Sequence, residues 1–499
     1  MLIDKAGFNN EKYLEEQTAE ITRRVKASRG RLYLEFGGKL MYDHHAARVL
    51  PGYDPNVKLR LLEKLKEQAE IILCIYAGDI EKRKIRGDFG ITYDSDALML
   101  IDGFRSRGIQ VRGVVITRFE EQPSAVAFEN KLKNRGVDVF RHYYTRGYPT
   151  DVDLIVSEEG YGRNDYVAPT KPLVVVTGPG PGSGKLATCL SQLYHDYRRN
   201  MKAGYAKFET FPVWNLPLKH PVNDAYEAAT ADLLDVNLVD PFHLDAYGEV
   251  AINYNRDVEA FPLVRRILEK ITGTKSPYSS PTDMGVNRVG FGIENDQAVR
   301  QAAEQEIIRR CFRYRCEYVM GLAEKKTVEK IELLMDNMNL TRYDRPVVEQ
   351  AEKRAEAEGD PDAKAAAIQL RNGSIVTGRT SELMHAASAA VLNAVKKLAG
   401  INPETHLLSP DTINSIRNLK QSIGSIPLHL DLEEVMIALS VSAASSPEAA
   451  KGMAKLTELR NCEAHLTHMP SSGDESGLRN LGINVTSDPR FASSRLFTG

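Results

Sequence analysis

The sequence is poor in cysteine and tryptophan, with five cysteines and one tryptophan among 499 residues. The cysteines are scattered and odd in number, so they predict reduced thiols and a cytoplasmic protein rather than a disulfide framework. No apolar run approaches the roughly 18 residues that a membrane span needs. The first residues, MLIDKAGFNNEKYLEEQ, lack the apolar core of a signal peptide. We therefore expect no membrane partner.

The sequence also lacks an excess of either charge. It has 65 Lys and Arg residues and 67 Asp and Glu residues, which give a net charge of −2. Such a balance gives no electrostatic reason to expect binding to nucleic acid. The hydrophobic content of 42% and the charged content of 26% are ordinary for a globular protein. The length predicts roughly two to four domains.

What the sequence does contain, over about its first 300 residues, is an alternation of short apolar segments and helical patterns. The expected strands are Arg31–Phe36, Ile71–Tyr76, Val111–Thr117, Val137–Tyr143, Leu154–Ser157, Leu173–Thr177 and Tyr205–Phe211. We predict a Rossmann-like α/β domain with a mainly parallel sheet over residues 1–295. Leu173–Thr177 is expected to be an interior strand, because it is an unbroken apolar run.

The remaining residues predict two further domains. Residues 296–400 show helical periodicity and charged, alanine-rich stretches, so we expect a helical domain with almost no strand. Part of its basic and aromatic face Glu306–Met320 is expected to contact another chain or another domain, and we expect a homo-oligomer. Residues 401–499 are expected to form a smaller C-terminal α/β domain. Its predicted helices are Leu432–Ala444 and Pro447–Leu459, and its strands lie around Glu463–Met469 and Ile483–Thr486.

The strongest chemical signal is TGPGPGSGK, from Thr177 to Lys185, directly after the interior strand. A phosphate-binding loop needs a buried strand, small residues that let backbone N–H groups approach, and a helix N-terminus that faces the anion. Apolar residues at helical spacing follow the glycines, and Lys185 stands where the lysine of a P-loop would reach a phosphate. The expected phosphate-binding residues are Gly178, Gly180, Gly182, Ser183, Gly184 and Lys185.

This stretch departs from the pattern G-x-x-x-x-G-K-[ST]. Pro179 replaces the first glycine, and Leu186 replaces the hydroxyl residue that would bind Mg²⁺. Pro179 and Pro181 also lack the N–H donors that a phosphate cradle uses. The alternative is a tight strand-to-helix turn whose glycines serve packing alone.

Other polar residues follow the predicted strands, at the sheet edge where ligands of parallel sheets bind. Lys39 and Arg86 there favour a polyanionic ligand, and His220 in the proline-rich loop PVWNLPLKHPVN is a candidate for substrate contact. Lys185, Lys39 and His220 are our catalytic candidates. The candidate Mg²⁺ ligands are Asp79, Asp232, Asp235 and Asp240. Ordinary surface, turn and cap roles are the alternative for each.

The spacing Cys462-x-x-His465-x-x-His468 is similar to a set of metal ligands. On a strand, however, alternation places His465 on the face opposite Cys462 and His468. A single zinc ion needs its ligands to converge. We therefore do not expect zinc there.

Three segments resemble a bacterial family of cytoplasmic proteins catalogued as a protein or domain of unknown function. They are the run from TKPLVVVTGPGPGSGK to LVDPFH, the segment FGGKLMYDHHAARVLPG and the segment LDLEEVMIALSVSAASSPEAAKG. The resemblance covers nearly the whole chain. It implies a Rossmann-like domain with helical and α/β additions, and it supplies no reaction, substrate or catalytic residue.

Two functions follow from the residues. The first is a nucleotide-dependent ligase or phosphotransferase that acts on a small metabolite, with ATP or another nucleotide and Mg²⁺ as cofactors. Catalysis would then rest on positioning and charge neutralisation. The alternative is a non-catalytic protein that binds a phosphorylated metabolite, or an oligomeric scaffold, and the missing hydroxyl after Lys185 favours it.

Overall fold

The computed structural model describes residues 6–86, 90–357, 359, 362–424 and 428–493. The chain divides into two compact units. Of the described residues, the N-terminal unit contains those of 6–227 and 235–303, and the C-terminal unit contains those of 228–234 and 304–493. Each unit is built around a sheet of its own, with six strands in the first and four in the second.

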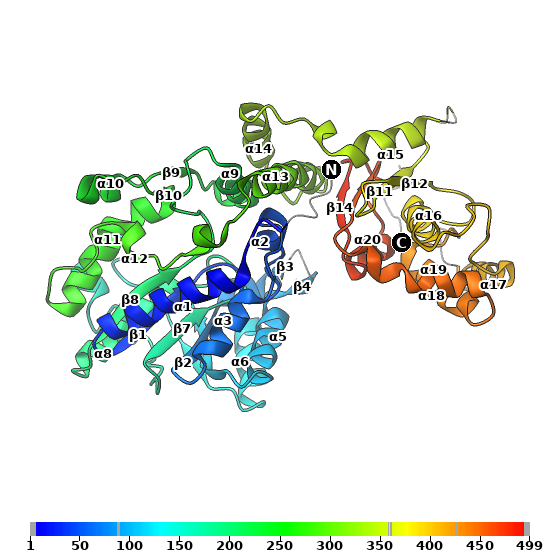
Figure 1. The fold of residues 1–499 in the computed structure, drawn as a ribbon. Helices are drawn as coiled ribbons and strands as arrows, with labels where there is room; N and C mark the ends of the chain where they lie inside the picture. The colour runs from blue at the N-terminus through cyan, green and yellow to red at the C-terminus, as the bar shows by residue number, and fades with distance from the viewer. Residues whose placement is uncertain (1–5, 87–89, 358, 360–361, 425–427, 494–499) are drawn as a thin grey trace. The chain divides into compact units, whose positions relative to one another are not determined.

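The sheet of the N-terminal unit is parallel throughout, with the strand order β6-β5-β2-β7-β1-β8 (Figure 1). Its strands are β1 (Arg31–Phe36), β2 (Ala69–Tyr76), β5 (Gln110–Thr117), β6 (Val139–Arg141), β7 (Leu173–Thr177) and β8 (Ala203–Phe208). Strand β7 lies between β2 and β1, and all of its residues are buried. The predicted parallel α/β sheet, with Leu173–Thr177 as an interior strand, is therefore confirmed.

One strand prediction in this unit is wrong. Residues 152–155 form the short helix α7 (Val152–Ile155) where the sequence suggested a strand. The carboxylate of Asp151 accepts a hydrogen bond of 3.0 Å from the backbone N–H of Leu154 and so caps the first turn. A local cap thus overrides a short apolar run.

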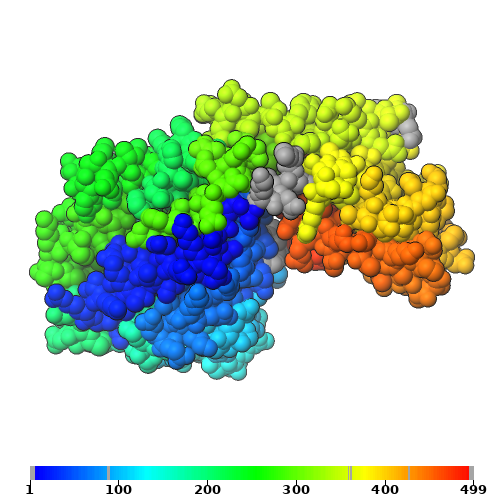
Figure 2. All heavy atoms as spheres, viewed as in Figure 1, coloured from blue at the N-terminus to red at the C-terminus, as the bar shows by residue number. Residues whose placement is uncertain are grey.

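One face of the sheet is covered by α8 (Lys185–Arg198) and α11 (Asn255–Thr272), whose apolar residues form a buried cluster with those of β2, β7 and β8. Helices α1 (Asn10–Ala27), α3 (Val57–Leu65) and α5 (Tyr93–Arg105) also pack on the unit. Figure 2 shows α1, in dark blue, lying against green residues that follow α11 in the chain. Arg24 of α1 donates hydrogen bonds to the carbonyls of Asp283 and Gly285 there.

The other elements of the N-terminal unit are short. They are α2 (His44–Val49), α4 (Ala77–Glu81), β3 (Ile85–Arg86), β4 (Ile91–Thr92), α6 (Pro123–Lys133), η1 (Tyr161–Arg163), α9 (Pro221–Ala229), β9 (Asn237–Val239), α10 (Pro241–Tyr247), β10 (Ile252–Tyr254), α12 (Pro281–Met284) and η3 (Val289–Gly292). Helix α13 (Asp296–Val319) begins in the N-terminal unit and ends in the C-terminal unit.

The C-terminal unit has a sheet of order β12-β11-β13-β14. Its strands are β11 (Ala365–Gln369), β12 (Ile375–Arg379), β13 (Glu463–Leu466) and β14 (Asn484–Ser487). Strand β11 is antiparallel to both neighbours, whereas β13 and β14 are parallel. Helices α16 (Ala386–Ala399), α18 (Leu432–Ala443), α19 (Pro447–Ala454) and α20 (Ser472–Asn480) pack on it around one apolar core. Its other elements are η2 (Ala231–Leu233), α14 (Lys325–Asn337), η4 (Arg342–Asp344), α15 (Pro346–Glu356), α17 (Pro410–Ser422) and η5 (Leu456–Leu459).

The prediction that residues 296–400 contain almost no strand is wrong, because β11 and β12 lie inside that range. The alanine-rich segment that suggested a helix is β11, which is buried along its whole length between β12 and β13. Burial between two strands outweighs the helix propensity of alanine.

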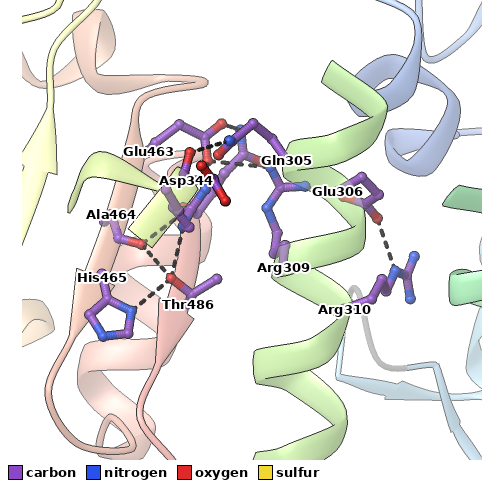
Figure 3. Close-up of polar contacts among 11 residues, drawn as sticks. Gln305, Glu306, Arg309, Arg310, Asp344, Glu463, Ala464, His465 and Thr486 are labelled. Carbon is purple, nitrogen blue, oxygen red and sulfur yellow. Dashed lines mark hydrogen bonds and ion pairs between the residues drawn. The ribbon is translucent and has the colours of Figure 1, made fainter. Parts of the chain in front are cut away.

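A buried ion network joins α13 to the C-terminal sheet (Figure 3). Arg345 is fully buried, and it donates hydrogen bonds of 2.6 Å to Glu463 and 2.9 Å to the hydroxyl of Thr486. Arg309 of α13 donates to the same Glu463 carboxylate at 3.3 Å and also pairs with Glu306. The neighbouring Arg310, Arg313 and Arg315 pair with Glu306, Glu317 and Glu332, so each arginine around residue 309 has a carboxylate partner.

The aromatic residues of the predicted subunit contact divide into two groups. Phe312 and Tyr314 are buried inside the C-terminal unit, where the Tyr314 hydroxyl donates to Asp232 at 3.1 Å. Tyr318 is 45% exposed. The expected homo-oligomer stays a prediction. Among the described residues, no helix is both long and apolar enough to cross a membrane.

Candidate functional site

The glycine-rich loop follows β7 at the point where the connections of the sheet diverge. From β2 the chain continues through α4 and α5 to β5, on one side of β2. From β7 it continues through α8 to β8, beyond β1 on the other side. Ligands of open α/β sheets bind at such a switch point, outside the carboxyl ends of the strands. The loop 178–184 therefore begins where this fold places ligands.

The four glycines of the loop have different roles. A Cβ atom at Gly178 would lie 2.3 Å from a backbone oxygen of β2, and one at Gly180 would lie 2.4 Å from a tyrosine hydroxyl of α5. At Gly184 a Cβ would lie 2.7 Å from a threonine methyl at the end of β5. These three positions require glycine for close packing. Gly182 has a φ of +74°, and a Cβ added there would meet no atom within 4 Å, so this residue lies open to solvent.

Lys185 is the first residue of α8, and its side chain folds back over the loop. Its ammonium donates hydrogen bonds of 3.1 Å to the carbonyl of Gly180 and 3.3 Å to the hydroxyl of Ser183. Gly184, in the left-handed conformation, stands before the helix and makes no side-chain cap. The positive end of α8 and the Lys185 charge therefore act on the same loop.

Arg118 supplies a second cation to this loop, and the sequence analysis did not select it. It follows β5, and its guanidinium donates to the carbonyl of Gly182 and lies 3.4 Å from the centre of the Tyr76 ring. Its Nε is buried and has no hydrogen-bond partner among the described residues. The hydroxyl of Thr117, one residue earlier, donates to the carbonyl of Ser183 at 2.8 Å. The end of β5 is thus fixed to the glycine-rich loop.

Among the predicted magnesium ligands, Asp79 interacts with one of these cations. It is in the first turn of α4, directly after β2, and its carboxylate is 3.8 Å from the Lys84 ammonium. Burial raises the pKa of the Asp79 carboxyl, while the charges of Lys84 and Arg118 lower it in part. Asp79 and Arg118 are therefore close enough to interact.

The three other predicted magnesium ligands have separate partners. Asp232 accepts from Tyr314, Asp235 pairs with Arg256 at 2.8 Å, and Asp240 caps α10 and accepts from the Thr282 hydroxyl at 2.6 Å. In the part of the chain that the structure describes, no three His, Cys, Asp or Glu side chains are grouped as a metal site requires. Magnesium binding stays a prediction.

The remaining candidates also have defined neighbours. Arg86 is buried and pairs with Asp96 at 2.7 Å. His220 is buried, with its Nε2 2.9 Å from Asp296, and burial lowers the pKa of its imidazole. The backbone carbonyl of Lys39 accepts a hydrogen bond of 3.1 Å from the Lys58 ammonium. For Arg86 and His220, these contacts fit the packing role that was the alternative.

A polar cluster at the carboxyl ends of β1 and β8 escaped the sequence analysis. Glu35 of β1 is paired in register with Lys207 of β8. The Lys207 ammonium donates to Asp257 and is 3.1 Å from Glu209, and the hydroxyl of Tyr254 donates to Glu209 at 2.9 Å. A lysine and a glutamate within the apolar strand segment YAKFE were the only sequence signal for this cluster.

Burial and charge set the protonation of this cluster. Burial raises the pKa of the Glu209 carboxyl to about 7, with further increases from Asp257 and Glu35 and a partial decrease from Lys207. Burial likewise raises the pKa of the Cys74 thiol to about 12, while the charge of Lys185 lowers it and that of Glu35 raises it. The Cys74 thiol of β2 donates to the hydroxyl of Thr188, in the first turn of α8, at 3.3 Å.

Replacing Glu209 with Gln is expected to change how stability depends on pH. The folded-state pKa of Glu209 is raised, so its stabilising contribution is present below the ordinary carboxyl pKa and is lost as pH rises through about 7. The free energy of unfolding is measured in urea at pH 5 and pH 8. Relative to the wild type, the Glu209→Gln variant should be about 1–3 kcal/mol more stable at pH 8 than it is at pH 5. The exposed Glu259→Gln variant, on α11, is the control. An equal pH dependence in all three proteins would contradict the prediction.

Comparison with known proteins identifies the family. The family model described as "Domain of unknown function DUF1846, N-terminal" matches residues 6–339, and the corresponding C-terminal model matches residues 343–497. A "UPF0371 protein" of Clostridium botulinum is 57% identical over 499 residues, and one of Clostridium tetani is 56% identical, each alignment covering 99% of both chains. One of Fusobacterium nucleatum is 55% identical over 503 aligned positions, again covering 99% of both chains. The chain belongs to this bacterial family, as its resemblance suggested.

Proposed function

We propose that this member of the DUF1846 family binds a nucleotide or a phosphorylated metabolite at the loop Gly178–Lys185. The observation that carries the proposal is the convergence of two cations on that loop. Lys185 from α8 and Arg118 from the end of β5 both donate to its backbone carbonyls. The loop ends an interior strand at the switch point of a parallel sheet, where phosphate ligands bind in this class of fold.

Each part of the loop has a task in binding phosphate. The N-terminus of α8 supplies backbone N–H donors and a partial positive charge. Lys185 adds a full charge, and the planar guanidinium of Arg118 fits two phosphate oxygens at once. Stacking on Tyr76 holds that guanidinium in place. Gly182 keeps the outer side of the loop open to solvent.

A nucleotide-dependent ligase or phosphotransferase is the enzyme that fits this site. Glu209, with a pKa of about 7, is suited to exchange a proton with a substrate at neutral pH. The non-catalytic alternative is favoured by Leu186, which stands where a P-loop has the hydroxyl that binds Mg²⁺. Nucleotide turnover that depends on Mg²⁺ would support the enzyme, and binding without turnover would support the alternative.

Calorimetric titration tests the proposal directly. The wild-type protein is titrated with ATP, GTP and pyrophosphate, each with and without Mg²⁺. We expect saturable binding of at least one of these ligands. The absence of binding by all three would leave the loop as a packing turn and would overturn the proposal.

Replacing Gly182 with Val is expected to weaken that binding about tenfold, because the new side chain would fill the open side of the loop. Val at a positive φ also costs about 1–2 kcal/mol of stability. Gly248→Val is a matched control, since Gly248 has a φ of +68° and equally open surroundings at the end of α10. Both variants should lose similar stability in urea, and Gly182→Val alone should lose binding. Equal ligand affinity in the two variants would contradict the prediction.

A further inference from the structure

Three helices of the C-terminal unit begin beside one another. Helix α16 starts after His385, α18 after Asp431 and α20 after Ser471. Asp474, in the first turn of α20, joins them, because its carboxylate accepts hydrogen bonds of 2.7 Å from His385 and 3.0 Å from the backbone N–H of Leu432. Helix α20 connects the parallel strands β13 and β14, so this place is also the carboxyl end of β13. Parallel strand pairs bind ligands at that end.

His468 lies in the segment between β13 and α20, and its imidazole is 6% exposed. Its Nδ1 is buried without a hydrogen-bond partner among the described residues. Side chains alternate along a strand, so His468 continues the face of Ala464 and Leu466, which pack against α16 and α18. A buried polar group without a partner is uncommon in a folded protein, and a bound ion or an ordered water is among the partners that account for one.

Two further histidines accompany it. The Asp474 carboxylate holds Nδ1 of His385, an arrangement that fixes an imidazole and leaves its Nε2 for another partner. The ring of His429 lies 6.4 Å from that of His385 and meets it edge-on. Backbone contacts bring these side chains together. His385 donates to the carbonyl of Leu430, next to His429, and Thr467, next to His468, donates to the carbonyl of Ala365, next to Lys364. Thr380 joins the two pairs, because it donates to the Lys364 carbonyl and its hydroxyl accepts from the backbone N–H of Ala386.

Lys364 and Arg417 add positive charge near these imidazoles. Lys364, just before β11, lowers the pKa of His429 and His468, and Arg417 of α17 lowers that of His429. Burial is the larger cause, and it brings the pKa of His468 to about 4. Neither Lys364 nor Arg417 has a carboxylate partner in the described part of the chain.

The acidic side chains nearby are already engaged. Asp474 binds His385, and Asp431 caps α18 by accepting from the backbone N–H of Glu434 at 3.0 Å. Glu434 pairs with Lys420 at 2.8 Å, Asp488 pairs with Arg342 at 2.8 Å, and Glu433 accepts from the hydroxyl of Ser476. An added anion would therefore meet unpaired cations and imidazoles.

We propose that the C-terminal unit binds a phosphate-type oxyanion among His385, His429, His468 and Lys364, at the carboxyl end of β13. This site is separate from the loop Gly178–Lys185 and does not depend on it. An anion there offsets the repulsion among the cations and supplies an acceptor for His468 once its imidazole is protonated. Because the anion's charge raises the pKa of these imidazoles, binding is coupled to proton uptake and strengthens as pH falls from 8 to 6.

The test uses the full chain with Lys185→Ala, so that the N-terminal loop does not contribute. Inorganic phosphate and glycerol phosphate are titrated calorimetrically at pH 6 and pH 8, in buffers of different ionisation enthalpy. Sulfate, whose charge is constant over this range, is the control that counts the protons taken up by the protein alone. Proton NMR follows the histidine Cε1–H signals in parallel. We expect tighter binding at pH 6, proton uptake, and shifts of three imidazole signals. The two probes distinguish free phosphate from a phosphomonoester as the preferred ligand.

Adding His468→Asn is expected to weaken this binding at least tenfold at pH 6, because a charge-assisted hydrogen bond is lost. Exposed His406→Asn, in the same unit, is the control and should leave binding unchanged. Lys364→Met, at a half-exposed position, is a second variant that reports on the site if His468→Asn does not fold. Absence of phosphate binding at pH 6, or equal binding by all the variants, would overturn the proposal. Nucleotide binding by the wild type tests the Gly178–Lys185 loop independently.

Discussion

Replacing Arg345 with Ala is expected to lower the free energy of unfolding by about 3–5 kcal/mol. Arg345 is fully buried and donates to Glu463, to the hydroxyl of Thr486 and to two backbone carbonyls of β13 and β14. Among the described residues, removing it leaves the largely buried Glu463 carboxylate with one cationic partner, Arg309, at the longer distance of 3.3 Å. Two strand-associated carbonyls also lose a donor inside the protein, where water does not replace it.

Urea unfolding followed by far-UV circular dichroism measures this loss, and amide hydrogen exchange in β13 and β14 locates it. Arg345→Lys should recover part of the stability, since lysine keeps the charge but lacks the planar set of donors. The control is Arg479→Ala, which breaks a surface pair with Glu475 on α20 and should cost less than about 1 kcal/mol. Similar losses for Arg345→Ala and Arg479→Ala would show that the network adds nothing to an ordinary surface pair.

Replacing Lys185 with Ala is expected to weaken binding of the phosphate ligand about 10- to 100-fold. A charge-assisted hydrogen bond contributes about 1.5–3 kcal/mol, and a factor of ten in affinity corresponds to about 1.4 kcal/mol. Stability should change little, because the ammonium is half-buried and its contacts are with the loop itself. The change in affinity is measured by calorimetric titration with whichever of ATP, GTP and pyrophosphate binds the wild type.

The matched control is Lys202→Ala, which removes an exposed lysine between α8 and β8. It should bind as the wild type does, and it separates the role of Lys185 from the general effect of one lost charge. If Lys185→Ala binds as tightly as Lys202→Ala, the ammonium of Lys185 has no part in binding. The site would then have to rest on Arg118 and the backbone of α8.

The parallel sheet could be predicted from the sequence because burial on both faces demands unbroken apolar strands, and Leu173–Thr177 is such a run. Strand β11 could not, because its alanines favour a helix and only its neighbours β12 and β13 make it a strand. At α7 the error was the reverse: a short apolar run predicted a strand, but the cap at Asp151 makes the segment a helix. The secondary structure of a segment could therefore be predicted where its own apolar pattern determines it. It could not be predicted where contacts with distant segments determine it.

The residues of the candidate site likewise differ in whether the sequence could predict them. Lys185 could be selected because its loop, strand and helix are contiguous in the sequence. Arg118 could not, since 64 positions separate it from the Gly182 carbonyl that it binds. The cluster of Lys207 with Glu35, Glu209 and Asp257 is likewise gathered from three separate places in the chain. Such a cluster is defined by strand register, which a single sequence does not reveal.

The chain passes between its two units more than once, and this limits where the protein can be cut into fragments. The chain changes unit at Glu227–Ala228, at Leu234–Asp235 and, inside α13, at Ala303–Glu304. The boundary between the two family segments, near residue 341, instead lies within the C-terminal unit. A gene fragment that starts at residue 343 encodes all four strands of that unit but lacks Arg309, a partner of Glu463. The C-terminal segment is therefore not a module that recombination can move intact, and the two segments are expected to be inherited as one gene.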